Sequence, residues 1–118
     1  TVQRAGGGGL ENTQLKKGLL DMLVLAMLER SDRYGFELVE RVSRHVEIAE
    51  RTIYPLLKRL RDSKLVTAYL QESTMGAPRK YYRLTDQGRR YLADAKTEWR
   101  EMRAAIDRLL EEAESEQK

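Results

Sequence analysis

The sequence predicts a mostly α-helical fold that contains one two-stranded β-hairpin and ends in a long helix. Three observations predict this fold class. Apolar residues recur at helical spacing in the segments before residue 63. A β-branched and aromatic region follows over 65–84, with glycine and proline in its middle. The last third of the chain then repeats apolar residues in steps of three and four, which is a helical seam.

The composition limits the class of protein. The chain has 118 residues, of which 41% are hydrophobic and 35% are charged, and this is typical of one soluble domain with much helical surface. It has no cysteine, which excludes a disulfide framework and a thiolate metal site. No apolar run is long enough to span a bilayer. We therefore expect a cytoplasmic protein with no cofactor, no metal and no membrane contact.

The two ends of the chain differ from its middle. Residues 1–10 include four consecutive glycines, which predict a flexible tail or an expression scar. The last eight residues carry four Glu and one Lys, so the remainder holds 21 basic and 15 acidic side chains. We expect residues 114–118 to form an acidic tail. The basic excess in the middle suits an anionic partner held by counterion release, or it is a solubilising surface.

The first helix is predicted over Glu11–Arg30, where the stretch LLDMLVLAML is apolar almost all round and should be buried on more than one side. Ser31 and Asp32 should break this helix and provide the N-cap of a second one. The second helix lies in YGFELVERVSRH. Its predicted apolar residues, about one turn apart, are Phe36, Val39 and Val42.

The third helix is predicted from its proline. Pro55 is tolerated only in the first turn, so the helix should begin between Ala49 and Thr52 and run to about Asp62. Two short helices with a tight link form a helix-turn-helix, whose second helix meets DNA bases with its first residues and phosphates with later ones. The predicted DNA contacts are Arg51, Thr52, Tyr54, Lys58, Arg59 and Arg61. The alternative is an ordinary amphipathic helix with solvated charges.

A basic hairpin should follow. LVTAYLQES and RKYYRL are predicted strands on either side of the loop TMGAP, in which Gly76 and Pro78 act as breakers. Alternation indicates that only one of Tyr81 and Tyr82 faces the core. A wing laid on DNA needs basic residues such as Arg79 and Lys80, and these are predicted DNA contacts. A solvent-facing hairpin is the alternative.

The final helix should begin after Thr85, which can cap it, and run for roughly 30 Å beyond the compact part at 1.5 Å per residue. An apolar stripe on a projecting helix needs a partner, and the simplest one is a second copy of the chain. We therefore expect a winged helix-turn-helix domain over 11–85 and a dimerisation helix over 86–113. The predicted interface residues are Leu92, Ala95, Trp99, Met102, Ile106 and Leu109, and the seam continues to Ala113.

The chain resembles the PadR-type transcriptional repressors, in the short subfamily with a single C-terminal helix, and is similar to their multidrug-binding members. The motifs LLDMLVLAML, YGFELVERV, RTIYPLLKRL, GAPRKYYRLTDQGR and the Trp-bearing final helix carry the resemblance. It implies a homodimer on a pseudo-palindromic operator, with repression relieved by a small, often aromatic, ligand. The family usually has glycine where Arg51 stands and a capping Ser or Asn near Ala49, so the operator is expected to differ.

Trp99, the only tryptophan, lies near the middle of the seam. Its simplest role is in the dimer core. The resemblance implies a second role, in which the two tryptophans of a dimer form a slot for a planar aromatic molecule. Arg103, one turn further on, would then favour neutral or anionic ligands.

An enzyme is not expected. The chain has one histidine, His45, and none of the GxSxG, Walker A, HExxH or GxGxxG motifs. The sequence therefore predicts a dimeric, sequence-specific DNA-binding repressor that responds to a ligand. The alternative is a winged-helix module that binds other proteins and shows no preference for a DNA sequence.

Overall fold

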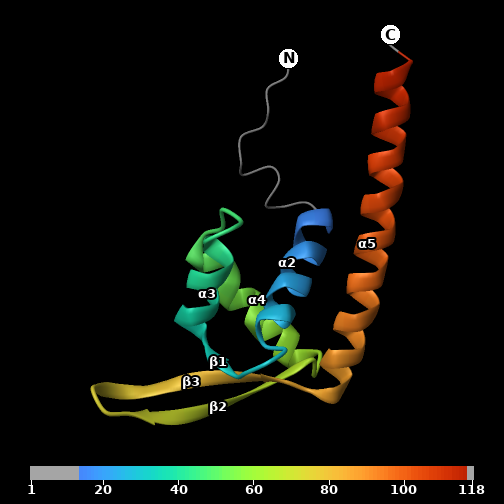
Figure 1. Ribbon diagram of the computed structural model, residues 1–118. Coiled ribbons are helices and arrows are strands. Elements are labelled where there is room, and N and C mark those ends of the chain that lie inside the picture. The colour runs from blue at the N-terminus through green and yellow to red at the C-terminus, as the bar shows by residue number, and fades with distance from the viewer. Residues whose placement is uncertain (1–13, 117–118) are drawn as a thin grey trace.

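The computed structural model describes residues 14–116, and its helices and strands form a winged helix with a long C-terminal arm (Figure 1). None of the helices in this range combines the length and apolar character needed to cross a bilayer. The elements are α2 (Gln14–Met27), β1 (Arg33–Tyr34), α3 (Gly35–Ser43), α4 (Glu50–Asp62), β2 (Val66–Ser73), β3 (Gly76–Leu84) and α5 (Asp86–Ser115). Helices α2, α3 and α4 lie together over the sheet, while α5 packs beside α2 and extends past it, which gives extents of 63 × 32 × 23 Å (Figure 1).

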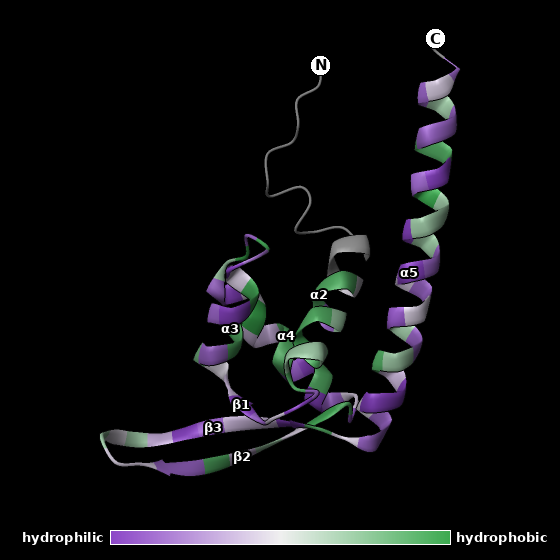
Figure 2. Ribbon diagram, in the orientation of Figure 1, coloured by the Kyte–Doolittle hydropathy of each residue, from purple (hydrophilic) through white to green (hydrophobic). Residues whose placement is uncertain are grey.

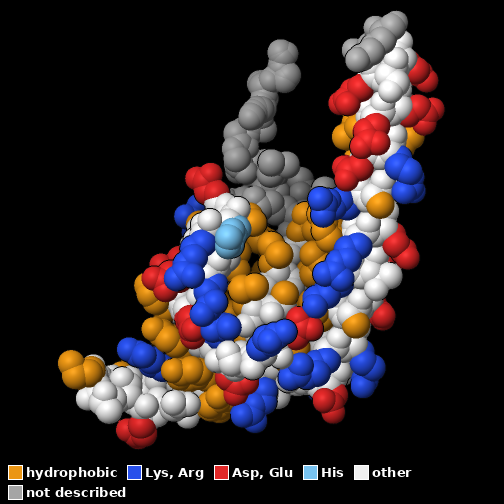
Figure 3. All heavy atoms as spheres, viewed as in Figure 1, with side chains coloured by type: hydrophobic (Ala, Val, Ile, Leu, Met, Phe, Trp, Pro, Cys, Tyr) orange, Lys and Arg blue, Asp and Glu red, His pale blue; other side chains and the backbone are white. Residues whose placement is uncertain are grey.

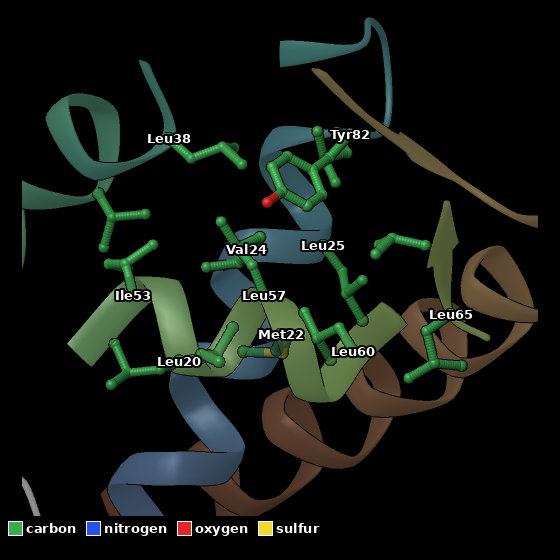
Figure 4. Close-up of a cluster of buried hydrophobic side chains, with 14 of the residues drawn as sticks. Leu20, Met22, Val24, Leu25, Leu38, Ile53, Leu57, Leu60, Leu65 and Tyr82 are labelled. Carbon is green, nitrogen blue, oxygen red and sulfur yellow. The ribbon is translucent and has the colours of Figure 1, made fainter. Parts of the chain in front are cut away.

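The core lies between the three short helices and the inner face of the sheet (Figure 4). Helix α2 contributes side chains from several sides, as its apolar sequence predicts, and α4 contributes one face only. The ribbon of α2 is mostly hydrophobic in Figure 2. Tyr82 of β3 closes the core from the sheet, so Tyr82 rather than Tyr81 is the buried tyrosine of the pair. The residues with the least exposure are Leu20, Val24, Leu25, Leu28, Leu38, Ile53, Leu57, Leu60, Val66 and Leu92.

The link between the first two helices differs from the prediction. Helix α2 ends at Met27, and α3 begins at Gly35 with Tyr34 as its N-cap residue and no side-chain cap. Ser31 and Asp32 therefore do not cap α3. They precede β1, whose two residues pair with β3 and make the sheet three-stranded, in the order β1-β3-β2. A two-residue strand has no periodicity of its own, so the sequence could not reveal it.

The buried face of α3 was predicted only in part. Leu38 and Val42 are buried, Val39 is half-buried, and Phe36 is 52% exposed. The packed face runs through Gly35, Leu38 and Val42, at helical spacing of three and four, and Phe36 lies outside it. Arg33 connects the start of α3 to the end of α2. Its guanidinium donates to the carbonyl of Met27 at 2.6 Å and pairs with Glu37 of α3 at 2.9 Å.

The third helix agrees with its predicted bounds. It begins at Glu50 with Ala49 as an N-cap that has no side-chain hydrogen bond. Pro55 was predicted to lie in the first turn, but it is the sixth residue of the helix and lies in the second turn, where the hydrogen bond to the carbonyl of Arg51 is lost. At its other end Lys64 has φ 65°, and the amide of Leu65 donates to the carbonyl of Leu60 at 2.9 Å. This is a Schellman motif, in which a left-handed residue ends the helix and satisfies its last carbonyl groups.

The hairpin is longer than predicted. Strand β3 begins at Gly76, so Thr74 and Met75 alone form the turn and most of the predicted loop is strand. Pro78 is tolerated there because the register shifts between Gln71 and Ser73, where the ladder is already interrupted. The hairpin is basic, as predicted, but its basic residues lie back from the tip, where Thr74 and Met75 form the turn.

Helix α5 is joined to the sheet through Thr85. As predicted, Thr85 caps the helix by accepting a hydrogen bond from the amide of Gly88 at 2.9 Å. The Thr85 hydroxyl in turn lies 2.8 Å from the carbonyl of Lys64 and 3.0 Å from that of Leu65. Gly88 is required by close packing, since a Cβ at this position would stand 2.1 Å from the carbonyl oxygen of Leu65.

Candidate nucleic-acid interface

The outer face of α4 presents four of the predicted DNA contacts in one stripe. Arg51, Tyr54 and Lys58 are exposed and Arg61 is half-exposed, and their spacing of three, four and three residues places them on one side of the helix. The opposite side is buried in the core. Lys58 pairs with Asp62 at 3.1 Å, but this ion pair is exposed and can be exchanged for another anion.

Tyr54 is held in place by the start of α3. A Cβ at Gly35 would stand 2.7 Å from Cε1 of Tyr54, so the glycine allows the ring to lie against the helix end. The ring remains 40% exposed. Burial and, next, the negative charge of Glu50 raise the pKa of Tyr54, so its phenol is a hydrogen-bond donor at neutral pH. The sequence motif that contains Gly35 is therefore in contact with Tyr54, although the two lie in different helices.

Arg59 does not share the outer stripe. Its guanidinium forms a two-pronged ion pair with Asp21 of α2, with Nη1–Oδ2 at 2.9 Å and Nη2–Oδ1 at 3.0 Å. The hydrogen bonds to Asp21 raise the pKa of Arg59 despite its partial burial. Both terminal nitrogens of this predicted phosphate contact therefore already donate to Asp21 within the same chain. Thr52 is half-buried at the first turn of α4, near the edge of the exposed stripe.

The wing carries Arg79 and Lys80 on opposite faces of β3, since neighbouring strand residues alternate. Both are exposed, and the Arg79 guanidinium lies over the Tyr34 ring, 4.6 Å from its centroid. Tyr34, Tyr81 and Tyr69 face one another across the three strands, with ring centroids 5.5 and 5.8 Å apart. In Figure 3 basic side chains appear over α3, along α5 and where the hairpin meets the helices, and none is visible at the hairpin's far end.

Asp32 ties the wing to the helices. Its carboxylate accepts from the Tyr69 hydroxyl at 2.6 Å and from Arg83 Nε at 3.1 Å. Burial opposes the charge of Asp32, but the hydrogen bonds from Tyr69 and Arg83 outweigh it and hold the pKa of the carboxyl below its ordinary 3.8. The predicted cap residue is therefore an anchor for β2 and β3.

The predicted seam on α5 divides into two parts. Leu92 is buried and Ala95 and Trp99 are half-buried, because this part of the helix packs against the core. Beyond it three seam residues stand free in the single chain, where Met102, Ile106 and Leu109 are 53%, 44% and 65% exposed. Leu110, at 55%, widens this exposed apolar strip.

A hollow of about 250 Å³ lies between α2 and α5, and Trp99 lines it. Its lining is mostly apolar, with Glu98 as the charged member. Arg103 does not line this hollow. Its guanidinium lies 3.9 Å from Asp107 on another side of α5. The full lining is Gly18, Leu19, Met22, Tyr91, Ala95, Glu98, Trp99 and Met102.

Comparison with known proteins decides the family. The model of the transcriptional regulator PadR-like family matches residues 24–94, which include α3, α4 and the whole sheet. The chain belongs to the PadR-like family. An uncharacterized protein X of Lysinibacillus sphaericus is 34% identical over 99 residues, which are 80% of this chain and 91% of that protein.

Solved structures agree with the PadR assignment. A PadR family transcription regulator from Clostridium difficile is 34% identical, with a TM-score of 0.72 over 77% of this chain and 97% of that one. A PadR-like transcriptional regulator from Bacillus cereus is also 34% identical, with a TM-score of 0.75 over 83% and 97% of the two chains. This PadR protein is therefore a DNA-binding transcription regulator and not an enzyme.

Three functional candidates in this PadR protein were missed from the sequence: Asp21, Asp32 and Glu98. Asp21 stood out only as a charge within an apolar segment, and its partner Arg59 is 38 residues away. Asp32 was assigned to a cap because its partners, Tyr69 and Arg83, lie 37 and 51 residues on. Glu98 precedes Trp99 directly, and the hollow beside both exists only once α2 packs on α5.

Proposed function

We propose that this PadR protein is a homodimeric repressor that reads a pseudo-palindromic operator with α4 and the wing and is released by a planar aromatic ligand. The observation that carries the proposal is the exposed stripe on α4, Arg51, Tyr54, Lys58 and Arg61, whose opposite face is fixed in the core. We retain the division into a DNA-binding unit over 11–85, a dimerisation helix over 86–113 and an acidic tail over 114–118. The predicted tail at residues 1–10 lies outside the described residues.

The α4 stripe suits a DNA groove for a physical reason. An arginine near the start of such a helix can pair with guanine, and a lysine further on can neutralise a phosphate. Arg51 and Lys58 have these positions. Arg79 and Lys80, set back from the wing tip, would follow the backbone beside the groove. Thr52 is retained as a contact to a thymine methyl group.

The exposed strip on α5 supports a second copy as the partner. Met102, Ile106 and Leu109 repeat along the free part of α5, and a helix that projects with an apolar stripe is stabilised by another helix. The same spacing includes Leu92, Ala95 and Trp99, so the predicted interface would continue into the packed part of α5. A dimer would also match the two-fold symmetry of a pseudo-palindromic operator.

The hollow beside Trp99 supports a ligand role and changes the expected ligand. Aromatic and apolar side chains line it, as they do most small-molecule sites. Its charged side chain is Glu98, whereas Arg103 points elsewhere. We therefore expect a planar aromatic cation, in place of the neutral or anionic ligand that Arg103 suggested.

Fluorescence anisotropy of labelled DNA tests operator reading. Duplexes from the region upstream of the gene are compared with scrambled duplexes over a salt series. Lys58→Ala should weaken binding to all duplexes and reduce the salt slope by about 1.8, the value for two phosphate contacts, one from each copy in the dimer. Tyr54→Ala should lower the affinity for the operator more than the affinity for the scrambled duplex. Arg108→Ala, which removes an exposed charge on α5, is the matched control and should bind as the parent does.

The opposite result would favour the protein-binding alternative. Equal and weak binding of the parent to operator and scrambled duplexes would remove sequence reading from the proposal. Parent-like binding by both Lys58→Ala and Tyr54→Ala would show that α4 does not contact DNA. In either case a partner protein for α5 would become the next question.

Emission from Trp99 tests the ligand class, since the chain has no other tryptophan. Ethidium, a planar cation, should quench this emission more strongly than the anion anilinonaphthalene sulfonate. Glu98→Gln should weaken ethidium binding about tenfold, the loss expected when a partly desolvated charge pair is broken. Arg103→Gln should leave ethidium binding unchanged. Constant emission with every compound would exclude this hollow as a ligand site.

A further inference from the structure

Asp21 is a charged residue placed in the apolar core. Helix α2 is otherwise packed with leucine, valine and methionine, yet Asp21 is only 8% exposed. Its two carboxylate oxygens both accept from Arg59, at 2.9 and 3.0 Å. The Arg59 side chain is 47% exposed, so the pair lies at the edge of the core with its acid inside.

Such a pair is an inefficient way to stabilise a core. Removing a carboxylate from water is unfavourable, and the attraction of its partner roughly compensates for this, while apolar side chains would pack there at no such disadvantage. A two-pronged arginine–carboxylate pair does have directional geometry, because two parallel hydrogen bonds fix both distance and orientation. The Lys58–Asp62 pair on the outer face, with both side chains more than 60% exposed, has no such constraint.

The Asp21–Arg59 pair connects the helix that lines the hollow to the helix that carries the proposed DNA stripe. Asp21 is next to Met22 on α2, and Met22 lines the hollow beside Trp99 together with Gly18 and Leu19. Arg59 is on α4, one residue after Lys58 of the proposed DNA stripe. Tyr91, which also lines the hollow, is close enough to Arg59 to favour its charged form. Helix α2 therefore contacts the hollow on one side and holds α4 on another.

We propose that Asp21 and Arg59 are positioning residues that fix the register of α4 against α2 and so couple the α2–α5 hollow to the DNA-reading face. This inference rests on the proposed reading of DNA by α4. Occupation of the hollow would displace α2, and the two-pronged pair would transmit that displacement to α4. Arg59 acts through Asp21 and does not touch DNA.

The first test uses Asp21→Asn, which keeps the size of the side chain and removes its charge. Operator affinity should fall about tenfold, as expected for residues that carry coupling, while the salt slope stays that of the parent. Arg59→Gln should match it, and the double variant should be no weaker than either single one. If Arg59 is instead a phosphate contact, Asp21→Asn frees it in both copies, so tighter binding with a salt slope steeper by about 1.8 would overturn the inference.

A second variant separates positioning from folding. Asp21→Leu combined with Arg59→Met replaces the pair by apolar side chains of similar volume, a change that often preserves or raises stability. We expect this variant to melt at or above the parent's temperature and still bind the operator about tenfold more weakly. If this double variant binds the operator with the parent's affinity, the pair has only a structural role and the inference is overturned.

The third readout is Trp99 emission during titration with unlabelled operator. Because coupling is reciprocal, DNA binding on α4 should change the environment of the hollow, and the parent's emission should shift on saturation. The shift should be absent in Asp21→Asn at saturating DNA. Glu29→Gln, which breaks the 2.8 Å ion pair between Glu29 and Lys96 of α5, is the control and should keep it. A shift retained in Asp21→Asn, or absent in the parent, would overturn the coupling.

Different results would exclude DNA reading by α4 and the positioning role of Asp21 and Arg59. If Tyr54→Ala and Lys58→Ala leave operator binding unchanged, DNA reading by α4 is wrong and the Asp21–Arg59 inference fails with it. If those variants weaken binding and Asp21→Asn does not, α4 still reads DNA and only the positioning role is excluded.

Discussion

Lys64 shows at the scale of one residue how α4 is ended. It holds φ 65°, a left-handed conformation that is unfavourable for a residue with a Cβ, by roughly 1–2 kcal/mol. Glycine adopts it freely but loses more entropy on folding, by about 0.4–1 kcal/mol. Lys64→Gly should therefore raise the free energy of unfolding by about 0.5–1 kcal/mol, measured by urea denaturation.

The neighbouring residue provides the control for that substitution. Ser63 has φ −84°, which any residue adopts, so Ser63→Gly should gain nothing and lose about 0.5–1 kcal/mol of stability. A loss of stability in Lys64→Gly equal to that in Ser63→Gly would show that the left-handed conformation carries no strain.

Single residues also show which details the sequence could predict. Thr85 was placed correctly, and so were the bounds of α4, because a helix start depends on neighbours within one turn. The burial of Leu38 and the exposure of Phe36 were not predicted, since a repeat of three residues drifts around a helix of about 3.6 residues per turn and so did not mark the packed face. Arg59 fits an outer contact by residue type, and the sequence gives no sign of its ion pair with the distant Asp21.

At the scale of elements, the wing is anchored by Asp32. Its carboxylate joins the segment after α2 to β2 through Tyr69 and to β3 through Arg83. The pKa of Asp32 is lowered in the folded chain, so its ionised form stabilises the fold at neutral pH. That contribution is lost as pH falls below 3.8 through the folded pKa.

Asp32→Asn should remove this pH-dependent contribution. The variant should be less stable than the parent at pH 7, and the difference between their free energies of unfolding should shrink as pH falls below about 3.8. Urea denaturation at pH 7 and at pH 3 measures it. Tyr69→Phe, which removes one hydrogen-bond donor and no charge, should reproduce only part of the loss. A difference that stays constant with pH would contradict the anchoring by an ionised carboxylate.

Elements were predictable in proportion to their length and periodicity. Helix α4 and the capped start of α5 were located closely, because their apolar spacing and caps are local signals. Strand β1 was missed, since Arg33 and Tyr34 become a strand only by pairing with β3. The hairpin turn was placed too broadly because Gly76 and Pro78, usual loop residues, lie in β3 beside a register shift.

At the scale of the whole molecule, the free half of α5 should decide the oligomeric state. Ile106→Glu places a charge in the proposed interface, and each copy loses about 2 kcal/mol of apolar burial. The dissociation constant of the dimer should therefore rise about a thousandfold, measured by sedimentation equilibrium. Operator affinity should fall with it, because one half-site is then bound alone.

Leu70→Glu is the matched control for oligomeric state. Leu70 is 67% exposed, as exposed as the strip on α5, but it lies on the wing. This variant should sediment as the parent does. Dimers that persist in Ile106→Glu, or a parent that sediments as a monomer, would contradict an interface on α5.

The single residue between β3 and α5 has a consequence for the DNA itself. Because Thr85 alone joins them, and Gly88 is wedged against Leu65, the arm cannot swivel relative to the wing. In the proposed dimer the distance between the two α4 helices would then be fixed. Half-sites moved apart by half a helical turn would face opposite sides of the duplex, and only one could be occupied. The operator's spacer length would therefore be as strongly selected as its bases.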